Sequence, residues 1–247
     1  MRAALTVLTA LLWACALTPP AAQAATCTAT SGAARLSLLE LYTSEGCSSC
    51  PPADRWFSQL PAVGSGVVPL AFHVDYWDQL GWKDPYAQAA FSQRQRARNS
   101  RLGWVYTPQV MRDGQDVRDW SQGVTAAVNP PPPARVRLTL ALTQAPQRIE
   151  VQAESRSTDA TTPQAGEVYL ALTENRLSSS VTAGENARTT LRHDHVVRTL
   201  VGPLAAQQVR TTFTLQPGWK AADLAVVAFV LDAKGQTLQV LALAACP

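Results

Sequence analysis

The sequence is poor in the residues that build most metal and nucleic-acid sites. It has only three histidines and a single Cys-x-x-Cys motif, so a tetrahedral zinc site would lack its second half. Basic residues exceed acidic residues by only three, which is too small a surplus to indicate a nucleic-acid partner. We therefore expect no metal, no other cofactor and no bound nucleic acid.

Long apolar runs are missing beyond the N-terminus, so we expect no transmembrane segment. The apolar stretch 3–17 follows Met1-Arg2 and is followed by Ala22-Gln23-Ala24, which has the small-x-small form of a leader cleavage site. Residues 1–24 are thus predicted to be a signal peptide, which places the protein outside the cell or in the periplasm. A less favoured alternative is a lipoprotein-type cleavage with Cys15 as the acylated residue.

Loss of the leader leaves four cysteines, an even number that suits an oxidising compartment. Two of them, Cys47 and Cys50, are separated by Ser48-Ser49 and can serve each other as a dithiol or a disulfide. Cys27 is then left for Cys246. We predict that this second pair is a structural disulfide joining the two ends of the mature chain.

A run of four prolines at 130–133 is the expected linker between two domains, because it favours a stiff, extended conformation. Before it, strands and helices alternate. We expect strands near 36–42 and 67–74, helices at 52–60, 84–100 and 119–128, and a hairpin whose strands 109–112 and 115–118 flank Asp113-Gly114.

After the proline linker the apolar residues alternate with polar ones, as in half-buried strands. About seven short strands predict an antiparallel sandwich. The expected fold is an α/β N-terminal domain followed by an all-β antiparallel sandwich (Ig-like) C-terminal domain. The expected boundaries are 1–24 for the signal peptide, 25–129 for the first domain, 130–134 for the proline linker and 135–247 for the sandwich.

Several separated motifs carry a family resemblance. They are ELYTSEGCSSCPPAD at 40–54, HVDYWD at 73–78, LGWKDPY at 80–86 and VYTPQ at 105–109, with a weaker echo in HVVR at 195–198. Together they resemble a bacterial family of predicted secreted proteins known as domain of unknown function 1223, which in turn looks like a branch of the thioredoxin superfamily.

The resemblance implies a thioredoxin-like first domain with a redox-active Cys47–Cys50 pair. It places Thr107 and Pro108 where such domains carry a cis-proline that faces the pair and contacts the substrate backbone. It also makes buried carboxylates near the pair candidates for proton transfer. These candidates are Glu40, on the strand that leads to the pair, and Asp75, at the end of the next expected strand.

These features predict an exported thiol–disulfide oxidoreductase that acts on a protein thiol or disulfide client. A non-catalytic binding or scaffold protein with a structural Cys47–Cys50 disulfide stays open, as does the handling of a soft metal such as Cu(I). His193 and His195 would share one face of a strand, and we expect both to be surface residues of the sandwich.

Overall fold

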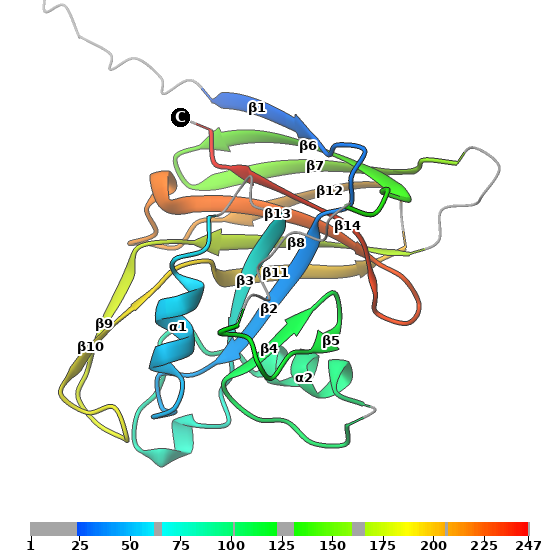
Figure 1. The fold of residues 1–247 in the computed structure, drawn as a ribbon. Coiled ribbons are helices and arrows are strands. Elements are labelled where there is room, and N and C mark those ends of the chain that lie inside the picture. The colour runs from blue at the N-terminus through cyan, green and yellow to red at the C-terminus, as the bar shows by residue number, and fades with distance from the viewer. Residues whose placement is uncertain are drawn as a thin grey trace, which may run out of the picture.

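The computed structural model describes residues 24–61, 66–100, 102–122, 131–159, 166–205 and 207–246. Its largest element is an eight-stranded mixed sheet (Figure 1). In spatial order the strands are β14 (Thr237–Ala244), β13 (Leu224–Leu231), β8 (Glu167–Glu174), β11 (Val196–Leu204), β3 (Val67–His73), β2 (Ser37–Thr43), β4 (Gln109–Arg112) and β5 (Gln115–Asp116).

A four-stranded antiparallel sheet packs over one half of the large sheet. Its order is β1 (Ala25–Thr30), β6 (Val136–Ala145), β7 (Arg148–Ser157) and β12 (Gln208–Thr214). A separate hairpin consists of β9 (Leu177–Val181) and β10 (Thr189–His193), and the two α-helices of the described residues are α1 (Pro51–Phe57) and α2 (Ala89–Arg98). Short 3-10 turns occupy Asp78–Leu80 and Ala221–Asp223.

The burial of each strand follows its sequence pattern. Every residue of β2 and β13 is buried, as expected for central strands that are covered on both faces. Along β6 and β7 buried residues alternate with more exposed ones, because only one face of the four-stranded sheet packs on the core.

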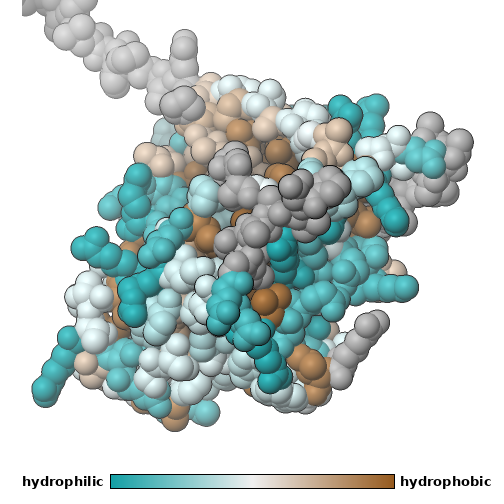
Figure 2. Space-filling view, in the orientation of Figure 1, coloured by the Kyte–Doolittle hydropathy of each residue, from teal (hydrophilic) through white to brown (hydrophobic). Residues whose placement is uncertain are grey.

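Both faces of the large sheet are covered. On one face α1 packs Phe57 against Leu39 and Leu41 of β2, and the four-stranded sheet covers β8, β13 and β14. On the opposite face α2 packs Phe91 against Tyr42 and its neighbours. In the view of Figure 2 hydrophilic residues cover most of the surface, and apolar residues gather near the edge where β1 lies.

The expected fold class, an α/β thioredoxin-like domain followed by a separate all-β antiparallel sandwich, is wrong. Strand β11 pairs antiparallel with β8 and parallel with β3, where Val196 is opposite Ala71. This pairing joins strands from the two halves of the chain into one mostly β structure. No local pattern encodes a pairing between strands that are 125 residues apart, since Val196 and Ala71 meet only in the folded chain.

Most local elements lie close to their expected positions. Strands β2 and β3, helix α1 and the hairpin of β4 and β5 all form, and Asp113 and Gly114 have the positive φ values of 49° and 83° that this tight turn requires. The helix expected from Asp84 begins only at Ala89, because the Asp84 carboxylate accepts hydrogen bonds from other segments. Strands β1, β9 and β10 were not expected.

Parts of the expected organisation fall outside the described residues. These include nearly all of the signal peptide 1–24 and most of the helix at 119–128. The described prolines of the expected linker run beside residues 33–35, where Arg35 N–H donates to the Pro132 carbonyl at 2.8 Å. The boundaries at this linker stay a prediction.

Candidate functional site

The Cys47–Cys50 pair lies in the turn between β2 and α1 and is joined as a disulfide, with the two Cα atoms 5.4 Å apart. Cys50 is the residue before the helix, and prolines occupy its first two positions, where a missing N–H costs nothing. Between the two cysteines Ser48 and Ser49 are exposed. The turn therefore offers its outer edge to solvent.

The hairpin of β9 and β10 holds this turn from outside, next to α1 (Figure 1). The Asn186 side-chain amide donates to the carbonyls of Glu45 and Cys47 at 2.8 and 3.0 Å. The Ser48 N–H donates to Glu185 at 2.9 Å. A segment nearly 140 residues away in sequence thus fixes the backbone around the pair.

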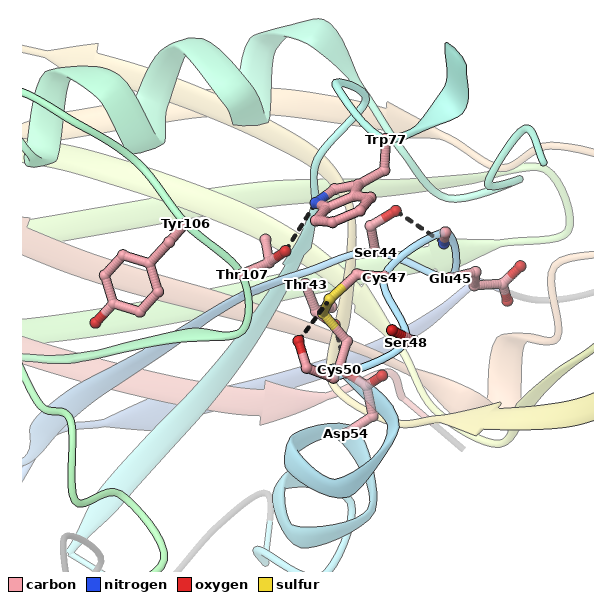
Figure 3. Close-up of a disulfide and its surroundings, with 12 residues drawn as sticks. Thr43, Ser44, Glu45, Cys47, Ser48, Cys50, Asp54, Trp77, Tyr106 and Thr107 are labelled. Carbon is pink, nitrogen blue, oxygen red and sulfur yellow. Dashed lines mark hydrogen bonds between the residues drawn. A yellow bond between two sulfur atoms is a disulfide. The ribbon is translucent and has the colours of Figure 1, made fainter. Parts of the chain in front are cut away.

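Both cysteines are buried, with 0% of each residue exposed. Figure 3 shows the Trp77 indole lying over Cys47. The indole N–H donates to the Thr107 hydroxyl at 2.8 Å, and the Thr107–Pro108 peptide bond is cis. Trp77 and Thr107 are themselves only half-buried, so part of each residue faces solvent.

Buried charges surround the inner side of the turn. His73 Nδ1 lies 2.7 Å from Asp84 Oδ2, and His193 Nε2 lies 3.0 Å from Glu45 Oε1. The two imidazole rings meet edge to face with centroids 4.8 Å apart. Trp82 closes the cluster by donating its indole N–H to Glu45 at 2.8 Å.

The charges of this cluster set one another's pKa values. Burial acts to lower the pKa of His73, but the neighbouring Asp84, Asp54 and Glu45 carboxylates outweigh it and the pKa is raised. Burial acts in the opposite sense on Asp84, yet its contact with His73 holds the pKa below the usual value. His73 and Asp84 therefore each favour the charged form of the other.

Glu40, one of the two carboxylates expected near the pair, points to the opposite face of β2 from Leu39 and Leu41. It is fully buried and accepts hydrogen bonds from Arg94 and Arg98 of α2 at 2.6 and 2.9 Å. Burial would raise its pKa, but the two guanidinium groups lower it to about 2. The structure thus places Glu40 in an ion-pair cluster on the far side of the sheet.

Asp75, the other expected carboxylate, also turns toward α2, where Ser92 donates a hydrogen bond to it. At the other end of the molecule Cys27 and Cys246 form a disulfide, with Cα atoms 5.7 Å apart. The structure therefore brings Cys47, Cys50 and Thr107 together around Trp77 and leaves Glu40 and Asp75 apart from them.

The prediction that His193 and His195 are surface residues is wrong, since the exposed fraction is 2% for His193 and 6% for His195. His195 Nε2 lies 2.9 Å from the Leu60 carbonyl, just beyond α1. Among the described residues no group of three or more His, Cys, Asp or Glu is arranged to hold a metal ion, and no helix is long and apolar enough to cross a membrane.

Sequence reasoning missed the residues that approach the pair from elsewhere in the chain, above all Asn186 and His193. It also missed Asp54, although a signal was present. Asp54 follows Cys50 by four residues, and positions i and i+4 of a helix are neighbours on one face.

Comparison with known proteins identifies the family. The family described as "Protein of unknown function (DUF1223)" matches residues 38–231, which is most of the chain. This chain belongs to that family. No curated protein matches it.

Two solved structures are similar in fold to this DUF1223 protein. One is a protein of Agrobacterium tumefaciens with 22% identity and a TM-score of 0.54, in an alignment that covers 86% of this chain and 96% of that one. The other is HBP35 of Porphyromonas gingivalis, with 13% identity and a TM-score of 0.60 over 86% and 76% of the two chains. At such identities the likeness concerns the fold alone.

Proposed function

We propose that this DUF1223 protein is an exported thiol–disulfide oxidoreductase that acts on a protein thiol or disulfide client. The observation that supports it is the disulfide between Cys47 and Cys50, which are three positions apart in a turn whose outer edge is exposed. Because a fold does not define a function, the proposed activity depends on this site and not on the overall architecture.

In the direction that reduces a client, the Cys47 thiolate attacks one sulfur of the client disulfide and the other client sulfur leaves as a thiolate. Cys50 then attacks Cys47, closes the Cys47–Cys50 bond and releases the second client sulfur. The client gains two electrons and the protein loses two. Thr107 accepts a hydrogen bond from Trp77, which covers the pair, and Pro108 follows it across a cis peptide bond; we propose that Thr107 and Pro108 contact the client backbone.

Export fits the same proposal. The two disulfides are consistent with an extracellular or periplasmic location, where such bonds persist. The expected signal peptide at 1–24 would bring the chain there.

Removing Cys50 should trap the first step. In the Cys50→Ser variant the reduced Cys47 still attacks a disulfide, but no second thiol resolves the product. With insulin as the probe, we expect a mixed disulfide through Cys47, detected by mass spectrometry and released by dithiothreitol. Turnover of insulin reduction should fall to background.

Ser178→Ala is the matched control, because it changes an exposed serine of β9 outside the motif and should leave insulin reduction unchanged. Absence of both insulin reduction by the wild type and adduct formation by the Cys50→Ser variant would contradict the proposal.

Because the pair is buried, we propose that Trp77 moves before thiol exchange. Thr107→Val removes the acceptor of its indole hydrogen bond at nearly constant side-chain shape. A hydrogen bond contributes about 0.5–1.5 kcal/mol, so we expect dithiothreitol to reduce the Cys47–Cys50 disulfide about 2–10-fold faster in this variant. Timed alkylation and mass spectrometry measure the rate.

Thr139→Val, a similar change on β6 in the other sheet, should leave that rate unchanged. Equal rates for Thr107→Val and the wild type would show that Trp77 does not limit access.

A second candidate function also has an observation in its favour. With no exposed part, the Cys47–Cys50 disulfide suits a permanent cross-link in a non-catalytic binding or scaffold protein. The two proposals differ in the trapping experiment, since a permanent cross-link yields no mixed disulfide.

A further inference from the structure

Three buried polar atoms on the inner side of the pair lack hydrogen-bond partners in the described structure: Asp54 Oδ2, His73 Nε2 and His193 Nδ1. Buried polar groups are nearly always hydrogen bonded, so each exception calls for an explanation. All three belong to one cluster, because the two rings are in contact and both act electrostatically on Asp54. None of them takes part in the proposed exchange between Cys47, Cys50 and the client disulfide.

Asp54 links this cluster to the pair. It lies in the first turn of α1, four residues after Cys50, and its N–H donates to the Cys50 carbonyl at 3.0 Å. Figure 3 shows its side chain rising from the helix toward Cys50. The Thr43 hydroxyl donates to Oδ1 at 2.8 Å, which fixes the carboxyl group and leaves Oδ2 free.

The surroundings of Asp54 make it a weak acid for an aspartate. It is only 5% exposed, and burial raises its pKa, although His193, His73 and the Thr43 hydroxyl each act to lower it. A raised pKa brings the carboxyl group closer to a thiol in proton affinity. The titratable groups around it come from β3, β10 and three connecting segments: His73, His193, Asp194, Glu45 and Asp84.

We propose that Asp54 exchanges the proton of the Cys50 thiol, with His73 and His193 as positioning residues that hold its charge. The inference rests on the proposed function. In the resolving step the Cys50 proton passes to Asp54, the Cys50 sulfur bonds to Cys47, and the bond from Cys47 to the client breaks. The released client thiolate then takes up a proton, from Asp54 or from water.

Asp54→Asn tests this directly, since asparagine keeps the shape and the acceptor for Thr43 but takes up no proton. Reduced protein is mixed with oxidised glutathione over a range of pH and quenched with acid. Mass spectrometry then separates the mixed disulfide from the closed Cys47–Cys50 form. We expect closure to be about 100-fold slower near neutral pH, the lower limit typical of a lost general base.

The pH profile separates proton exchange from a structural effect. The loss should shrink as pH rises, because Cys50 then ionises without help. In the Cys50→Ala background, Asp54→Asn should leave the first step, formation of the glutathione adduct, unchanged. Asp232→Asn, a carboxylate in the turn after β13, is the matched control and should close like the wild type.

Infrared difference spectra of the wild type, oxidised minus reduced, supply a test that does not depend on the variant folding. We expect the signal of a buried protonated carboxyl group to change with the redox state. Closure by Asp54→Asn at the wild-type rate at every pH, or an unchanged carboxyl signal, would overturn this inference alone. A Cys50→Ala variant that forms no glutathione adduct would overturn the proposed function as well.

Discussion

Glu40→Gln should lower the free energy of unfolding by about 3–5 kcal/mol, the cost typical of removing one partner from a buried ion pair. The Glu40 carboxylate is fully buried and forms ion pairs with two guanidinium groups, those of Arg94 and Arg98. It also accepts a hydrogen bond from the Tyr42 hydroxyl at 3.2 Å. Glutamine fills the space but leaves two buried positive charges with no counter-charge. Urea unfolding measures the change.

The pH dependence of this effect has a definite sign. The pKa of Glu40 falls from 4.5 to about 2 on folding, so its stabilising contribution is complete above about pH 4.5 and is lost as pH falls through about 2. The difference between wild type and Glu40→Gln should therefore shrink in acid.

Glu150→Gln is the matched control for Glu40. Glu150 also pairs with an arginine, Arg148, at 2.9 Å, but both side chains are about half exposed. Exposed ion pairs contribute about 0–1 kcal/mol, so this variant should change stability little. Equal effects of the two substitutions would contradict the account of Glu40.

Replacing Cys27 and Cys246 together by alanine should lower the free energy of unfolding by about 2–5 kcal/mol. Their disulfide joins residues 219 positions apart, and a loop of that length gives the upper end of the range in the chain-entropy account. It also fastens β1, an edge strand of the four-stranded sheet that pairs only with β6. Amide hydrogens of β1 should exchange faster in this variant.

The other disulfide provides the comparison. Cys47 and Cys50 are three positions apart, and so short a loop predicts a loss of about 2 kcal/mol when both are replaced by alanine. A larger loss from this pair than from Cys27 and Cys246 would contradict the loop-closure explanation.

Local patterns predicted much of the secondary structure. The alternation of Val136, Leu138 and Leu140 with polar residues marked β6, and Asp113-Gly114 marked the turn between β4 and β5. The start of α2 was predicted wrongly, since the helix was expected from residue 84 and begins at Ala89. In the fold the Asp84 carboxylate lies against His73 and accepts hydrogen bonds from the N–H groups of Glu45 and Tyr86.

The buried arginines show a second limit. Arg94 and Arg98 lie four residues apart on α2, a spacing typical of a solvated helix face. In the fold they meet Glu40 from β2, and Arg98 also donates to the Gly235 carbonyl at 2.7 Å. A helix pattern reports which residues share a face, but not what lies opposite that face.

By itself the sequence determined the presence of a cysteine pair in a strand-to-helix turn, the strand periodicities and the tight turns, since each depends on residues within a few positions of one another. The tertiary structure alone decided that β11 joins β3, that Trp77 covers Cys47, that Asn186 reaches Cys47 and that His193 pairs with Glu45. These contacts join residues from 30 to about 150 positions apart. They depend on which buried surfaces and charges match when the sheets assemble, and no local spacing carries that information.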